Sequence, residues 1–394
     1  MFAALFLSRR HIYEIITTEL APDAPASAPP SNNSRVEWRL NVVAAMQRGN
    51  IAIHDRDPFA GAGGVAHGWS FAVALHPSDE HGDGSARRQM KRVRLDAGAL
   101  NRRVESAILG LRDPGLSAGE RVPNIFVVPF VAADGRRRVD DPLIDPVTRT
   151  PRTLASPETL AAIENCPQGG LRHYLRAVVP ANGKEIRTQD GLPVLPAQDS
   201  GTGVTAFVHL ALEGGMLYAE FIATVMPPVR TRYQLGDNLR PERVAARAAH
   251  HTVANFPRDN LLGPARLVGV GWDAVRLRSR MLRSGKAADE FRYYDYGAHF
   301  SVRELAARLP MVKFMQRLDA AKYIALVDKT VSEAVVDFLE EHGVDTTDFR
   351  NAVANVSYDM SSKTFHDGQQ IFGDNNRVTQ RNTSGGPKGG GRRG

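Results

Sequence analysis

The segment VTAFVHLALEGGMLYAEFIATV, residues 204–225, decides the fold class expected from this sequence. Val204–Leu212 and Met216–Val225 are rich in β-branched and other apolar residues, which is typical of strands. Glu213-Gly214-Gly215 joins the two runs, and its glycines supply the positive φ angles that a tight hairpin turn requires. The segment therefore predicts a hairpin of two antiparallel strands.

More strands and two helices are predicted on the N-terminal side of this hairpin. Strand-like runs bounded by Gly, Pro and Asp occur at Ile51–His54, Trp69–Leu75, Ile125–Val131 and Leu171–Val179. Helices are expected at Ala97–Leu111 and Pro157–Asn165, the second with Ser156 as N-cap and proline at its first position. We therefore expect a linker-bearing segment at 1–35 and then an α+β domain at 36–234 with a mixed, mainly antiparallel sheet.

A helical domain is expected at 240–355, because apolar residues there recur at intervals of three and four. Its long amphipathic helix has one apolar face, formed by Phe314, Leu318, Ala321, Ile324, Val327, Val331, Val335 and Phe338. Ser301 and Glu304 form a capping box upstream, and Gly343 closes the helix. Beyond it we expect a short β-motif at 356–380 and a disordered Gly/Arg-rich tail at 381–394.

The stretch from Arg240 to Gly285 mixes apolar residues with arginines and supports two interpretations. One is a helix packed on the first domain with solvated arginines. The other is a segment lying on an anionic bilayer, with these candidate surface residues: Leu267, Trp272, Val275, Arg276 and Arg280. Gly263, Pro264, Gly269 and Gly271 predict breaks in the helix, which favours the first interpretation.

Composition limits the partners and the compartment. The net charge is +7 and the pI about 9.6, which favours acidic partners: nucleic acid, an anionic membrane or an acidic protein. Cys166 is the single cysteine, so a disulfide framework and a thiolate zinc cage are excluded. No run approaches the roughly 20 apolar residues of a spanning helix. We expect a cytoplasmic protein, with membrane association left open.

No motif in the sequence commits the chain to catalysis. Gly183-Lys184 is followed by Glu185, so the phosphate-binding GxxxxGK[ST] loop is absent. Gly61–Ala66 matches GxGxxA superficially, but Asp57-Pro58-Phe59 precedes it where a buried strand is required. We therefore assign no catalytic, cofactor-binding or metal-binding residue and expect no cofactor. A site assembled from distant residues would escape this search, so an enzyme stays an alternative.

Several sequence blocks resemble a family of uncharacterised actinobacterial proteins that carry similar blocks in the same order. The blocks are Tyr294–Ala298 (YDYGA), Ser301–Glu304 (SVRE) and Phe338–Thr347 (FLEEHGVDTT). The likeness extends back through Trp69–Val73 and His173–Leu175. It implies no activity. Some members of the family are described as membrane proteins, which favours the membrane-surface interpretation.

A second resemblance concerns the C-terminal segment. Gly373–Val378 follows Gln370-Ile371-Phe372 and is similar to the GxxNxV half of the amyloid signalling motifs of RHIM-type adaptors. The candidate interaction residues are Ile371, Phe372, Gly373, Asn376 and Val378. Alternating apolar and amide side chains can stack in register. The alternative is a β-turn that closes a small hairpin.

Three hypotheses about function remain from the sequence. The favoured one is a non-enzymatic interaction or adaptor protein that signals or self-assembles through its C-terminal β-motif. The alternatives are a hydrolase or ligand-binding enzyme with a site in 36–234, and a peripheral membrane protein. Nucleic acid is the less favoured partner because basic runs such as Arg136-Arg137-Arg138 lack interleaved aromatic residues.

Overall fold

The fold was analysed in a computed structural model of the 394-residue chain. It describes residues 2–19, 49–77, 95–117, 119–166, 170–180, 202–233, 239–298, 301–307 and 314–361, with a few isolated positions between these ranges. The chain divides into two compact units, Met1–Ala352 and Val353–Gly394.

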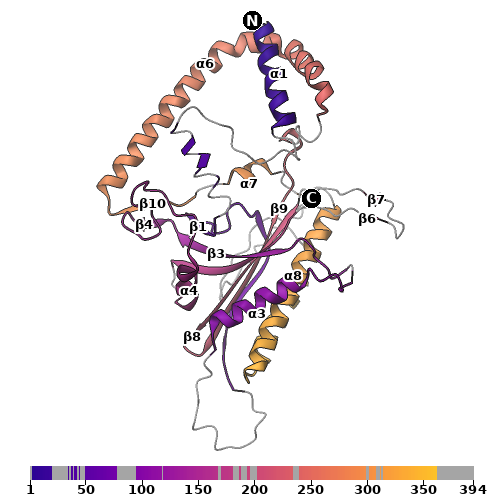
Figure 1. The fold of residues 1–394 in the computed structure, drawn as a ribbon. Coiled ribbons are helices and arrows are strands. Elements are labelled where there is room, and N and C mark those ends of the chain that lie inside the picture. Colours follow the sequence, from indigo (N-terminus) through magenta and orange to yellow (C-terminus); the bar gives the residue numbers. More distant parts are fainter. Residues whose placement is uncertain are drawn as a thin grey trace, which may run out of the picture. The chain divides into compact units, whose positions relative to one another are not determined.

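A six-stranded sheet with the order β1-β3-β5-β8-β9-β2 forms the centre of the first unit (Figure 1). Its strands are β1 (Ile51–His54), β2 (Gly64–Ala74), β3 (Phe126–Asp134), β5 (Leu171–Val179), β8 (Gly203–Glu213) and β9 (Met216–Met226). β1 and β3 are parallel, and the other neighbours are antiparallel. The predicted mixed, mainly antiparallel sheet is confirmed.

The hairpin predicted from residues 204–225 joins β8 to β9. Glu213 pairs with Met216, and Gly214 and Gly215 form the two-residue turn with φ of 61° and 82°. Two positive φ angles match the right-handed twist of the flanking strands, so the glycines meet a backbone requirement. The predicted bounds of β1, β5 and the second helix also agree with the structure.

Helices α3 (Ala97–Gly110), α4 (Pro157–Asn165) and α8 (Phe314–Glu341) pack on the sheet. Figure 1 shows α3 and α8 crossing in front of the strands. The core between helices and sheet contains the fully buried residues Leu100, Val104, Ile108, Val331, Val335 and Leu339. On β2, His67 Nε2 and Trp69 Nε1 lie 2.9 and 2.8 Å from the carboxylate of Asp328 on α8. The C-terminal part of α8 therefore faces the core, as predicted for this helix.

An aromatic cluster around Phe59 and Phe207 covers part of the opposite sheet face. Short helix α7 (Val302–Ala306) lies against the loop that follows Phe59, because Glu304 Oε1 accepts hydrogen bonds from the Gly61 N–H (2.7 Å) and the Gly63 N–H (3.2 Å). The capping box is half formed, since Ser301 Oγ accepts from the Glu304 N–H while the carboxylate binds this loop. The superficial GxGxxA match is thus a loop whose donors are occupied by the protein's own carboxylate.

Two further helices lie outside the sheet layer. α1 (Phe2–Thr18) packs on α6 (Val244–Glu290), which is a continuous 47-residue helix containing Pro257 and Pro264. The predicted breaks in α6 are therefore wrong. Gly263 and Gly271 have open space around them, and the helix continues through residues of poor helix propensity because propensity is a weak prior.

Smaller elements complete the described chain. They are β4 (Arg136–Arg138) paired with β10 (Tyr293–Asp295), β6 (Ile186–Arg187) paired with β7 (Pro193–Leu195), the 3-10 turns η2 (Thr231–Tyr233) and η3 (Pro241–Arg243), and α9 (Thr347–Ser361).

The predicted β-motif at 356–380 begins as helix in the structure, because α9 extends to Ser361. Asp345 accepts from the Thr347 N–H at the start of α9, and no Gly or Pro interrupts the sequence before Ser361. Residues 362–394 lie outside the described residues, and with them the candidates Ile371, Phe372, Gly373, Asn376 and Val378.

Candidate interaction surface

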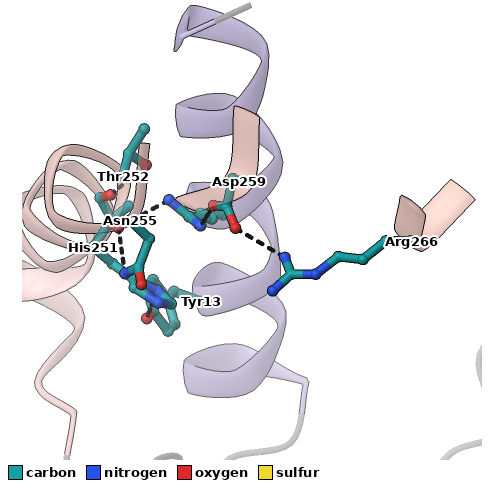
Figure 2. A network of polar contacts seen from close by, with 8 residues as sticks. Tyr13, His251, Thr252, Asn255, Asp259 and Arg266 are labelled. Atoms are coloured by element: carbon teal, nitrogen blue, oxygen red, sulfur yellow. Dashed lines mark hydrogen bonds and ion pairs between the residues drawn. The ribbon is translucent and has the colours of Figure 1, made fainter. Parts of the chain in front are cut away.

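The first part of α6 is attached to α1 by a polar network (Figure 2). Tyr13 of α1 is buried beside Val244 and Ala248, and its hydroxyl lies 2.8 Å from Nδ1 of His251. Arg9 of α1 donates to the His251 carbonyl oxygen (2.9 Å) and forms an ion pair with Asp259. These contacts fix α6 against α1 as far as Asp259.

Two arginines share one carboxylate at the end of this network. Asp259 also accepts a hydrogen bond of 2.9 Å from Arg266, which lies seven residues further along α6. Desolvation opposes ionisation of Asp259, but the hydrogen bonds from Arg9 and Arg266 outweigh it and hold its pKa below the ordinary value. Burial, together with the charge of Arg9, lowers the pKa of His251. The imidazole is therefore favoured in its neutral form, the form that can accept a hydrogen bond from Tyr13.

Beyond Asp259, large apolar side chains of α6 are exposed. Leu261 is 81% exposed, Leu267 75% and Trp272 62%. The other large apolar residues that are more than half exposed in this stretch are Val268, Val270, Val275, Leu277 and Leu282. A helix packed on the first domain would bury the apolar residues along one of its faces. Within the described residues that packing is not observed, so the prediction of a packed helix is wrong here.

The exposed residues follow two helical faces. Leu261, Ala265, Val268, Trp272 and Val275 recur at intervals of four and three, and Leu267, Val270 and Leu277 occupy a second apolar face. Arg276, Arg280 and Arg283 recur at the same intervals along a third face. We call residues 261–283 the α6 surface. It contains all five of the membrane candidates identified from the sequence: Leu267, Trp272, Val275, Arg276 and Arg280.

Two observations on the described part of the chain bear on an enzyme site. No group of three or more His, Cys, Asp or Glu side chains there could hold a metal ion. A hollow of about 470 Å³ beside α4 is lined by Glu158, Thr159, Ala162, Ile163, Cys166 and Leu171. Its polar groups come from one helix, whereas active sites bring together groups from several elements. No described helix is long and apolar enough to cross a membrane.

The block Tyr294–Ala298 has a structural role. The Ala298 N–H donates to the Ile53 carbonyl oxygen (3.0 Å) and the Tyr296 N–H to that of Gly135 (2.9 Å). A Cβ at Gly297 would lie 2.6 Å from the His54 carbonyl carbon, so only glycine fits beside the end of β1. The block therefore closes the β1 edge of the sheet.

Sequence reasoning missed the attachment of α1 to α6. Residues 1–35 were predicted to contain only a short segment and a linker, yet Arg9 and Tyr13 contact residues more than 200 positions away. The apolar residues Phe6, Tyr13 and Ile16, which meet the start of α6, were the available signal. A helix pattern in one element does not identify its partner.

The fold and the α6 surface define an α+β protein with a mainly antiparallel sheet and a long helix whose distal half is exposed. The AbeC-like domain model matches residues 68–377, most of the chain, and the chain belongs to the AbeC-like domain family. This match is consistent with the resemblance to an uncharacterised family. Neither the curated proteins nor the solved structures contain a match.

Proposed function

We propose that the chain is a non-enzymatic docking protein whose α6 surface binds an anionic membrane surface, without crossing it. The observation that supports this most is the exposure of Leu261, Leu267 and Trp272 beside arginines on one helix. Large contiguous apolar patches on a protein surface mark interaction sites. A helix with this composition can place the apolar face of Leu261, Trp272 and Val275 among acyl chains and its arginines at the headgroups.

Charge separates a lipid surface from a second copy of the chain. Residues 261–283 contain five arginines and one acidic residue, Asp273. Pairing of two such segments would bring like charges together in a region of lowered dielectric, which opposes association. Anionic headgroups instead neutralise the arginines, with about 1 kcal/mol for each basic residue near the surface.

The test is co-sedimentation of the full chain with vesicles of phosphatidylserine and phosphatidylcholine, and with vesicles of phosphatidylcholine alone. We expect binding to the anionic vesicles that falls as salt is raised. The double variant Trp272→Asp, Val275→Asp should lose binding, whereas Val147→Asp, Leu154→Asp should keep it, because the control residues are exposed apolar side chains outside α6.

Charge is tested separately with Arg276→Gln and Arg283→Gln. Removing two basic residues should weaken binding by about 2 kcal/mol, or about thirtyfold. Binding that survives Trp272→Asp, Val275→Asp would overturn the proposal. Concentration-dependent dimers in the absence of lipid that the same double variant abolishes would instead identify a second copy as the occupant of the α6 surface.

Self-association through the C-terminal segment is a separate part of the adaptor hypothesis and rests on the sequence alone. Ile371, Phe372, Gly373, Asn376 and Val378 supply the alternating apolar and amide side chains that in-register stacking needs. The full chain should bind thioflavin T at high concentration, and Asn376→Asp with Ile371→Lys should abolish this. A chain that stays monomeric and thioflavin-negative would remove this role.

A further inference from the structure

Arg176 on β5 is a half-buried cation without an acidic partner in the described part of the chain. Its guanidinium carbon lies 5.0 Å from the centre of the Phe130 ring, and its Nε is buried without a hydrogen-bond partner. In the sheet register Arg176 stands opposite Phe207 of β8 and Val128 of β3. Its immediate strand neighbours are therefore apolar.

A second arginine is held near it. Arg303 of α7 contributes a positive charge that, after burial itself, lowers the pKa of Arg176. α7 is fixed on both sides: Glu304 accepts from the loop N–H groups of Gly61 and Gly63, and the Arg230 side chain donates to the Ala307 carbonyl oxygen (3.0 Å). The helix that carries the exposed Arg303 is therefore held in place by its neighbours.

An unpaired cation in such surroundings is energetically unfavourable. A charge taken out of water is normally paired, because its desolvation costs several kcal/mol. A second positive charge nearby adds to that cost. Sequences retain locally unfavourable groups mainly where they serve function. With Phe130 against one face of the guanidinium and Nε buried, the Nη groups are left as the donors for a ligand.

We propose that Arg176 and Arg303 form a binding site for a small oxyanion, a phosphate or carboxylate group. Both groups present paired oxygens that match the planar fork of a guanidinium. The nearby Gly61 and Gly63 donors are not part of the site, because Glu304 already occupies them. This inference is independent of the α6 surface, and its test contains no lipid.

The experiment measures thermal unfolding of the full chain in sodium phosphate, sodium acetate and sodium chloride at equal ionic strength. A ligand that binds the native state raises the Tm in proportion to the logarithm of its concentration above Kd. We expect such a rise in phosphate or acetate relative to chloride, and the stronger of the two identifies the oxyanion class. Calorimetric titration with inorganic phosphate or acetate gives the Kd.

The variants test the direction of the Tm change that the proposal expects. Arg176→Met should unfold in chloride at the same Tm as the wild type or higher, because it removes an unpaired cation, and it should lose the anion response. Arg303→Gln should weaken anion binding at least about tenfold. Arg103→Gln, which removes a surface partner of Glu341, is the matched control and should keep the full response. Trp272→Asp, Val275→Asp should also keep it.

Three results would overturn the site. The first is a wild-type Tm that does not differ between the three salts. The second is an Arg176→Met variant that keeps the wild-type response to anions. The third is an Arg176→Met variant whose Tm in chloride is well below that of the wild type. The last result would mean that Arg176 has a structural partner. If Arg176→Met does not fold, that also counts against the proposal, and Arg303→Gln then decides whether an anion is bound at all.

Discussion

Gly63→Ala tests the contact between the loop of residues 57–63 and the C-terminal end of β9. Gly63 has a φ of +96°, which non-glycine residues rarely adopt. A Cβ there would lie 2.5 Å from the carbonyl carbon of Val225 and 2.7 Å from the Cα of Met226. Both are backbone atoms of β9 and its end, so relief requires the loop or the strand to move.

Two costs add in this variant. Holding alanine in an unfavourable φ region costs about 1–3 kcal/mol, and forcing extra volume into a packed site costs about 1–3 kcal/mol. We therefore expect Gly63→Ala to lower the free energy of unfolding by about 2–6 kcal/mol, a large fraction of the about 5–15 kcal/mol that stabilises a typical domain. The shift of the loop would also lengthen the hydrogen bond between the Gly63 N–H and Glu304.

Two neighbouring glycines serve as controls. Gly64 has nothing within 4 Å of its Cβ position, so Gly64→Ala should change the free energy of unfolding by less than about 1 kcal/mol. Gly61 shares the φ of +96° but would meet only the Ser301 side chain, whose Oγ is 3.4 Å away, so Gly61→Ala should fall between the two. Urea denaturation followed by far-ultraviolet circular dichroism measures all three. Equal, small effects at Gly63 and Gly64 would refute the loop geometry.

Two other predictions concern the core. Leu339→Ala on α8 should destabilise the protein by about 2–5 kcal/mol because Leu339 is fully buried. Leu318→Ala on the same helix should cost less than about 1 kcal/mol, since Leu318 is 51% exposed. Comparable losses of stability in urea denaturation would contradict the exposure of the start of α8. Burial, with the nearby His209, lowers the pKa of His173 from 6.5 to about 4. The unfolded chain then binds more protons than the native one between these values, so stability should fall as the pH drops from about 6.5 to about 4, by up to about 3 kcal/mol for this group. His173→Gln should flatten the pH dependence of the urea midpoint, and an unchanged slope would show that His173 is not the group responsible.

Much of the sheet was predictable because its signals are local. The glycines of the β8–β9 turn, the Ser156 N-cap of α4 and the apolar face of α8 each specify an element through residues close in sequence. The sequence predicted α8 as one amphipathic face, but Phe314 and Leu318 of that face are exposed while Val331 and Val335 are buried. Periodicity identifies a face, and the neighbouring elements decide how much of it is covered.

The candidate surfaces divide in the same way. The sequence shows directly that residues 240–285 combine apolar and arginine side chains, but it predicted helix breaks that α6 does not have. Arg176 showed no signal in sequence, since its lack of a partner depends on Phe130, Phe207 and Arg303 from three other elements. Motif searches detect residues that act at fixed spacing and miss those brought together by a sheet.

The sequence by itself determined the strands, the turn at Gly214-Gly215 and the composition of the α6 surface, because backbone preference and periodicity are properties of short segments. Only the tertiary structure decided the strand order, the attachment of α1 to α6, the uncovered state of residues 261–283 and the unpaired charge of Arg176. These depend on which distant segments exclude water from one another, and that outcome is fixed by packing across the whole unit rather than by any one segment.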